Sequence, residues 1–156
     1  MVAGATKVIS GGADAVGVGG LDFFKSYYNF QYQWWEGNNS SFSYFDNTDG
    51  TPNSGYIERS VYLHPSYGNV RVVFSWLNRG SYTYSHRFDA HPIGMDMDIL
   101  VYDPNGNYVA ASSSWDNPYE MVNFSPSVAG NYTVKISRYA NRDTSSQFSA
   151  GLVIDW

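Results

Sequence analysis

Residues 94–120 read GMDMDILVYDPNGNYVAASSSWDNPYE, and this stretch decides the fold. Its first part alternates acidic and apolar residues, which is typical of a half-buried β-strand. Asp103-Pro104-Asn105-Gly106 is a tight-turn sequence, so residues 107–112 are predicted to return as the second strand of a hairpin. The acidic residues lie at strand ends and in loops, and carboxylate oxygens are the ligands that a hard cation such as Ca²⁺ prefers.

The same alternation recurs on both sides of this hairpin. Apolar residues occupy alternate positions in 56–64, 70–76, 122–124, 132–136 and 148–156. Such segments bury one face and expose the other, as the strands of an antiparallel sheet do. Turn sequences separate them at regular spacing. About eight short strands of this kind predict an all-β fold, namely an antiparallel β-sandwich of the jelly-roll type.

The composition limits the classes of protein to consider. The chain has 156 residues, which suits one main domain, and carries a net charge of −5 without any Lys/Arg cluster. Nucleic-acid binding is therefore disfavoured. The chain contains no cysteine, which excludes disulfides and thiolate chemistry. No apolar run is long enough to span a bilayer, and we expect any export signal of a secreted protein to lie outside these residues.

The N-terminal residues allow two interpretations. We divide the chain into an extension, 1–35, and a sandwich, 36–156. Residues 1–20 are small and weakly polar, so they are either the end of a helix that packs on something outside this chain or a β-prone segment that needs a partner sheet. In the second case the segment completes the sheet of a neighbouring subunit. The residues expected at that interface are Ala5, Lys7, Val8, Ile9, Trp34 and Trp35.

Five acidic residues are candidate calcium ligands. Asp96 and Asp98 are two residues apart in a strand, so they share a face and repel each other unless a cation lies between them. Asp89 from the preceding loop, with Asp116 and Glu120 from the following one, would add carboxylate oxygens from other segments. The alternative is that these acids are solvated at strand ends or cap turns. Asp103 is well explained as the first residue of its turn.

Other motifs give little indication of catalysis. The three histidines lack metal-ligand spacing, and neither a nucleophile elbow nor a phosphate-binding loop is present. Hydrolytic catalysis within this chain is therefore not expected. Glycosylation sequons begin at Asn38, Asn39, Asn123 and Asn131, which is compatible with an exported surface. Aromatic residues make up 18% of the chain, more than a core of this size encloses, so some are expected to contact a partner.

Two segments carry a resemblance to a known family. Residues 96–112 and the sequence Val128-Ala129-Gly130-Asn131-Tyr132-Thr133-Val134 resemble the bacterial and archaeal pre-peptidase C-terminal domain, which follows secreted proteases. Residues 1–5 and 14–22 look like the closing helix and tail of a subtilisin-like catalytic domain. The Asp, His and Gly-Thr-Ser motifs of subtilases are missing, so any protease would lie upstream of Met1.

The resemblance implies an extracellular, non-catalytic β-sandwich, often calcium-stabilised, that assists folding, stability or attachment of a secreted subtilase-like protein. Its expected partners are a protein or polysaccharide surface. The rival hypothesis is a structural subunit that polymerises into an extracellular filament or sheath. In that case residues 1–20 add a strand to the next copy of the chain. An enzyme would need a nucleophile and a base that the sequence does not offer.

Overall fold

The computed structural model describes residues 5–6, 20–21, 32–39, 45, 55–79, 94–114, 117–141 and 147–156. This part of the chain is almost entirely β-strand, with one short 3-10 helix, η1. In chain order the elements are β1 (Ala5–Thr6), β2 (Gly20–Leu21), β3 (Tyr32–Asn39), β4 (Tyr56–Leu63), η1 (Pro65–Tyr67), β5 (Val70–Arg79), β6 (Met95–Tyr102), β7 (Tyr108–Ser112), β8 (Tyr119–Phe124), β9 (Gly130–Asn141) and β10 (Gln147–Asp155).

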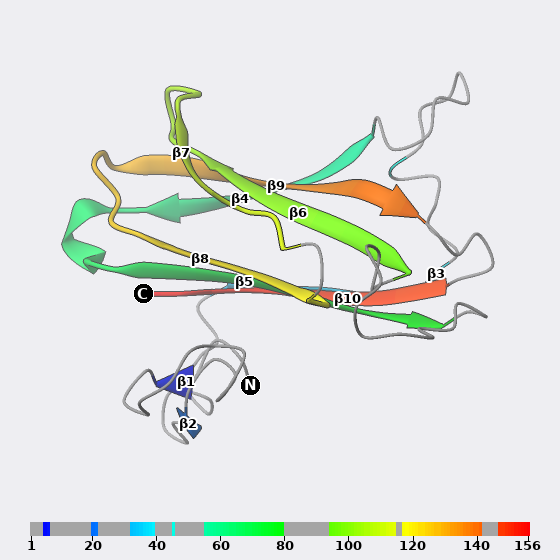
Figure 1. Cartoon of the computed structure of the whole chain (residues 1–156). Coiled ribbons are helices and arrows are strands. Elements are labelled where there is room, and N and C mark those ends of the chain that lie inside the picture. Colours follow the sequence, from blue (N-terminus) through cyan, green and yellow to red (C-terminus); the bar gives the residue numbers. More distant parts are fainter. Residues whose placement is uncertain are drawn as a thin grey trace.

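Strands β3 to β10 form two four-stranded antiparallel sheets that face each other (Figure 1). We call the sheet of order β3-β10-β5-β8 the lower sheet and the sheet of order β4-β9-β6-β7 the upper sheet, as Figure 1 draws them. The pairs are nested, because β3 pairs with β10, β4 with β9, β5 with β8 and β6 with β7. This is the arrangement of a jelly roll, so the predicted fold is confirmed.

Alternate side chains of both sheets build one core. In the upper sheet the strand β6 contributes Met97, Ile99 and Val101, all fully buried. The lower sheet contributes alternate residues of β5 and β10, among them Phe74 and Leu152. Fully burying an aliphatic or aromatic side chain of this size contributes about 1.5–3 kcal/mol. The alternation seen in the sequence therefore corresponds to an apolar face turned inward on β4, β5, β6, β8, β9 and β10.

The predicted hairpin is present as β6 and β7, joined by the turn at Asp103. One carboxylate oxygen of Asp103 accepts hydrogen bonds of 2.8 Å from the backbone N–H groups of Asn105 and Asn107. The other accepts one of 3.0 Å from the Asn107 side-chain amide. Gly106 has φ of +82°, a conformation that glycine adopts readily. The carboxylate of Asp103 is thus used inside the turn.

Gly130, the first residue of β9, lies against this turn. It has φ of +150°, and a Cβ atom placed on it would lie 2.6 Å from Cγ of Pro104. Two residues later, the buried Tyr132 donates a hydrogen bond of 3.1 Å from its hydroxyl to the carbonyl of Val128. The two segments on which the family resemblance rests, 96–112 and 128–134, therefore pack together as one structural unit.

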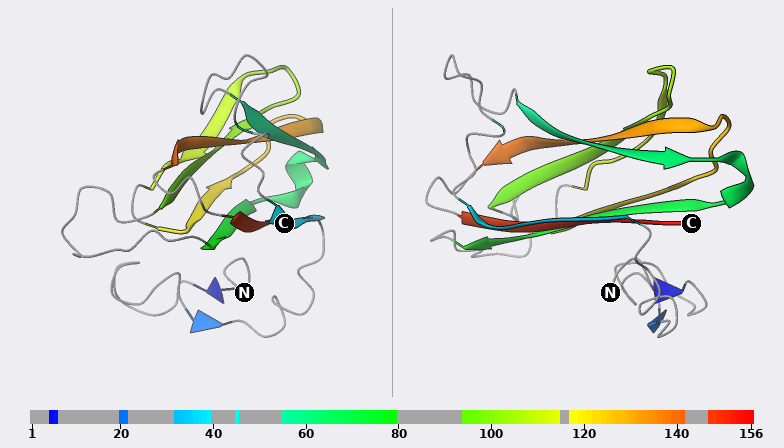
Figure 2. Two further views of the ribbon diagram at one scale, coloured as in Figure 1. Left: turned by 90° about the vertical axis from the view of Figure 1, so that its right-hand side faces the viewer. Right: turned by 180° about the vertical axis from the view of Figure 1, so that it is seen from behind.

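The N-terminal strands lie outside the sandwich. β1 pairs with β2 in a separate two-stranded sheet, and in the views of Figures 1 and 2 both lie below the lower sheet. β3 belongs to the sandwich, with Trp34 opposite Leu152 and Trp35 opposite Gly151 of β10. The sandwich consequently begins at or before Tyr32, slightly earlier than a boundary between residues 35 and 36.

Candidate functional site

Asp96 and Asp98 lie on the outer face of the upper sheet and line one cavity. Asp96 is buried and Asp98 is partly buried, and the cavity, of about 300 Å³, is completed by Ser113 and Tyr139. Their two-residue spacing on β6 is the reason they share this face. The cavity thus brings two carboxylates together with two hydroxyl-bearing side chains.

The electrostatics of this cavity disfavour two ionised aspartates. Burial, and secondly the negative charge of Asp96, raise the pKa of Asp98 to about 6. A group in this condition is ionised at neutral pH only at a cost in free energy. A cation between the carboxylates would offset both the burial and the repulsion. The two carboxylates are ligands of the kind that calcium accepts.

Glu120 has a different position. It is on β8 of the lower sheet, shares the inward face with Val122 and Phe124, and is almost completely buried. Its carboxylate accepts hydrogen bonds from the Ser112 hydroxyl and, at 2.6 Å, from the Ser114 backbone N–H. It does not line the cavity of the two aspartates. Glu120 therefore connects the edge strand β8 of one sheet to the end of β7 in the other.

Burial also dominates the titration of Glu120. It raises the pKa of Glu120 to about 7, although the hydrogen bonds from Ser112 and Ser114 act in the opposite direction. The charges of Asp98 and Asp96 raise the pKa further, so the three carboxyl groups lie within electrostatic reach of one another. Among the residues that the structure describes, no three acidic or histidine side chains are placed to hold one metal ion.

The remaining predicted site residues are distributed as follows. Asp89, Asp116, Lys7, Val8 and Ile9 lie outside the described residues, so the structure gives no position for them. Ala5 is in β1, and Trp34 and Trp35 are in β3, as are the sequon residues Asn38 and Asn39. Asn123 in β8 and Asn131 in β9 are exposed, and the Nε–H of Arg71 donates to the Asn123 side-chain carbonyl at 3.1 Å. Glycosylation of these residues stays a prediction.

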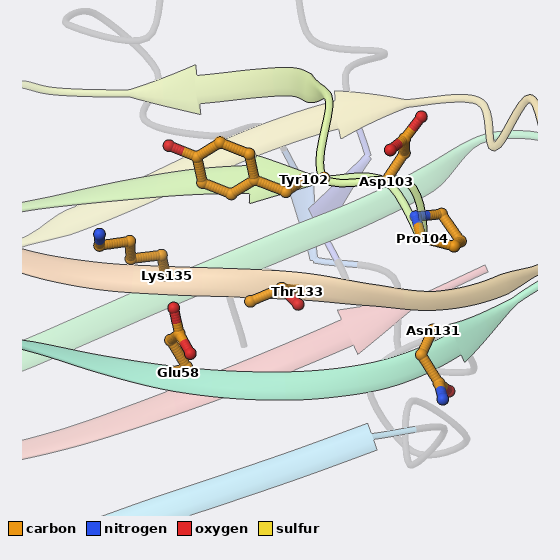
Figure 3. Close-up of a pocket in the computed structure, with 8 residues that line it drawn as sticks. Glu58, Tyr102, Asp103, Pro104, Asn131, Thr133 and Lys135 are labelled. Atoms are coloured by element: carbon orange, nitrogen blue, oxygen red, sulfur yellow. The ribbon is translucent and has the colours of Figure 1, made fainter.

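Sequence reasoning missed a second site, a polar groove of about 360 Å³ on the outer face of the upper sheet. Figure 3 shows the side chains around it, which come from four places in the chain. We call it the outer groove. Its lining residues are Glu58 of β4, Asn131, Thr133 and Lys135 of β9, Tyr102 of β6, and Asp103, Pro104 and Gly106 of the β6–β7 turn.

Strand register explains why these residues meet. Glu58 is opposite Lys135, and Thr133 is opposite Tyr102, in adjacent ladders of the upper sheet. The only signal in the sequence was the polar half of each alternating segment, because the even-numbered residues of 56–62 and the odd-numbered residues of 131–139 point outward. Which of them would be neighbours depends on the strand order, which no local pattern encodes.

Comparison with known families adds no assignment, because no family model matches the chain. In the described part of the chain, no helix has the length and apolar character needed to cross a membrane. The site is therefore interpreted from its own chemistry, which offers two oxygen-rich places on one sheet face, the aspartate cavity and the outer groove.

Proposed function

We propose that this chain is a non-catalytic, extracellular β-sandwich module, stabilised by calcium, that serves the folding, stability or attachment of a secreted subtilase-like protein. The observation that carries the proposal is the unit formed by the β6–β7 hairpin and the start of β9. It contains the residues that resemble the pre-peptidase C-terminal domain, and Gly130 packs on Pro104 within it. The resemblance thus concerns residues that have a definite structural task in this chain.

The calcium part of the proposal rests on the aspartate cavity. The carboxylates of Asp96 and Asp98 would hold the ion, with the oxygens of Ser113 and Tyr139 beside them. Glu120 is engaged with Ser112 and Ser114, so its contribution would be electrostatic. A bound cation would favour the ionised form of Asp98 and connect β6 with the segment that follows β7.

A calcium titration of thermal unfolding tests this site. The chain is first freed of metal and then melted with increasing Ca²⁺. An ion present at about 100 times its Kd stabilises the folded state by about 2.7 kcal/mol. For a domain of this size that corresponds to a rise in Tm of about 5–10 °C. Chelator should reverse the rise.

Two variants make the titration specific. Asp98→Asn should lose most of the calcium response, because it removes a carboxylate from the cavity. Asp103→Asn is the matched control: it weakens the turn and lowers Tm at every calcium concentration but keeps the response. An unchanged Tm of metal-free wild type on adding Ca²⁺, or a full response in Asp98→Asn, would remove the ion from the proposal.

The non-catalytic part has its own test. The purified chain is incubated with casein, with and without a serine-directed fluorophosphonate. We expect no cleavage in either sample. Cleavage that the fluorophosphonate abolishes would show a serine peptidase within these residues and would contradict the proposed role.

A structural subunit is the second candidate, and open sheet edges favour it. Among the described strands, β3 and β4 each have a partner on one side only, and both are eight residues long. Unpaired edges of this length accept a strand from another chain. Arg59 makes β4 the poorer acceptor, since it shares the inward face with Ile57 and Val61, and inward charges discourage edge pairing. Strand addition would therefore take place on β3.

Polymerisation is the readout for this candidate. Electron microscopy and analytical ultracentrifugation of the full chain should reveal filaments, and a chain lacking residues 1–20 should remain monomeric. If the full chain is monomeric at all concentrations, the subunit hypothesis is wrong. The calcium experiment above does not depend on this result.

A further inference from the structure

The exposed aromatic side chains of the described residues gather on one face. The large apolar residues with the greatest exposure are Tyr56, Tyr62, Tyr108 and Tyr139, which are 48%, 55%, 62% and 70% exposed. All four are on the outer face of the upper sheet, because they alternate with buried residues of β4 and β9 or, for Tyr108, lie opposite Tyr102. A tyrosine presents a flat apolar ring and a hydroxyl, so it can stack on a ligand and hydrogen-bond to it.

Three of these tyrosines neighbour residues of the outer groove: Tyr62 is opposite Asn131, Tyr108 is opposite Tyr102, and the ring of Tyr56 contacts Lys135. The floor of the groove is the outward side of β9, with Thr133 at the centre, and one wall is the β6–β7 turn with Tyr102 (Figure 3). The rings of Tyr102 and Tyr108 are in edge-to-face contact, with centroids 6.4 Å apart. Figure 3 shows Glu58 on the other side of β9 from Tyr102. The groove thus crosses three strands and has an aromatic ring in one wall.

The polar groups of the groove suit a ligand that both donates and accepts hydrogen bonds. Glu58 offers acceptors, Lys135 offers donors, and Asn131 and Thr133 offer both. In the described part of the chain, none of these four side chains makes a hydrogen bond or an ion pair with another side chain. Lys135 is held with Nζ 3.5 Å from the ring centroid of Tyr56, which fixes its position without using its hydrogen-bonding capacity on an acceptor.

The three charged side chains of the groove, Glu58, Asp103 and Lys135, sum to one net negative charge. Glu58 and Lys135 contribute one negative and one positive charge and lie opposite each other in the ladder. The third charge is on Asp103, whose carboxylate already accepts hydrogen bonds from Asn105 and Asn107 within its own turn. A polyanion would meet no excess of positive charge here, and a polycation little negative charge. An uncharged ligand rich in hydroxyl groups matches this arrangement.

We propose that the outer groove binds a neutral oligosaccharide, with Tyr102 stacking against the apolar face of a sugar ring and Glu58, Thr133 and Lys135 hydrogen-bonding to its hydroxyls. This inference rests on the proposed attachment role and names its ligand class and its surface. It places attachment on the upper sheet, away from the lower sheet, beside which β1 and β2 lie. The ligand would be a segment of a neutral polysaccharide.

The experiment is a titration of the full chain, produced in a host that leaves Asn131 unmodified. The probes are maltohexaose, cellohexaose, mannohexaose and N-acetylchitohexaose. A heparin fragment and a proline-rich collagen-like peptide represent the polyanionic and the protein alternatives. Binding is followed by calorimetry and by amide chemical shifts. We expect saturable binding of at least one neutral hexasaccharide, with shifts concentrated at Tyr102, Thr133 and Lys135.

Two substitutions locate the ligand. Thr133→Val keeps the shape of the side chain and removes its hydroxyl, and Tyr102→Leu removes the ring. Each should weaken binding about three- to tenfold, the effect of losing one hydrogen bond or one stacking contact. Ser137→Ala, on the same face of β9 but outside the groove, is the matched control and should bind like wild type. Melting curves confirm that each variant is folded.

The proposal is overturned if no neutral probe binds, if only heparin or the peptide shifts the groove residues, or if Ser137→Ala weakens binding as much as Thr133→Val does. Failure of the oligosaccharide proposal can be distinguished from failure of the proposed function by the calcium response. A chain that responds to calcium but binds no glycan keeps the module and loses this ligand. Products shorter than the added hexasaccharide would instead show catalysis, which contradicts the proposed non-catalytic role.

Discussion

Gly130 shows how a single residue holds together the unit formed by the β6–β7 hairpin and the start of β9. Its φ of +150° and the 2.6 Å between an added Cβ and Pro104 leave no room for a side chain. Pro104 is a rigid ring within the β6–β7 turn, so it cannot rotate away. The glycine is required by a contact between two segments that are distant in the sequence.

Replacing this glycine should therefore be costly. Gly130→Ala combines backbone strain with a steric clash, and we expect a loss of about 2–4 kcal/mol in the free energy of unfolding. Gly106→Ala is the control, because Gly106 also has positive φ but its added Cβ would meet nothing within 4 Å. That variant should lose about 1–2 kcal/mol. Urea unfolding at constant pH measures both, and equal losses would mean that Pro104 moves aside.

The carboxyl group of Glu120 connects two elements that belong to different sheets. It receives hydrogen bonds from Ser112 at the end of β7 and from Ser114 just after it, while its own strand β8 is an edge of the lower sheet. On this side the edges β7 and β8 are therefore joined by side-chain contacts. The sandwich holds a titratable group at that junction, and its pKa of about 7 is far above the ordinary value of a glutamate.

Raised carboxyl pKa values predict that the metal-free sandwich loses stability as pH rises. Between about pH 4 and pH 7 the folded chain holds protons on Glu120 and Asp98 that the unfolded chain releases, so the free energy of unfolding decreases with pH through this window. The contribution is fully present below about pH 4 and is lost above about pH 7. Each group contributes roughly 1–3 kcal/mol at most.

The measurement compares wild type with Glu120→Gln in chelator, by chemical unfolding at several pH values. Glutamine stays neutral, so the variant should gain stability relative to wild type as pH rises from about 5 to about 8. The difference between the two curves isolates Glu120 from every other titrating group. A difference that stays constant with pH would show that Glu120 titrates normally.

For the molecule as a whole, much of the fold could be predicted. Alternation in 56–64, 70–76 and 132–136 predicted strands because burying one face of a sheet demands a period of two. The Asp103 turn fixed the β6–β7 hairpin through contacts between neighbouring residues. Both rest on interactions that are local in the chain. The candidate calcium ligands Asp96 and Asp98 were placed on one face by the same rule.

The inward position of Glu120 and the outer groove could not be predicted from local alternation, because both depend on how the strands assemble into sheets. Glu120, an acid in an exposed-looking loop sequence, faces the interior because β8 closes the lower sheet with its apolar side toward the core. The outer groove exists because the nested pairing places β4, β9 and β6 side by side in a given register. Local alternation tells which residues point outward. Only long-range pairing decides which of those residues become neighbours, because strands distant in the sequence choose each other by burying a common core.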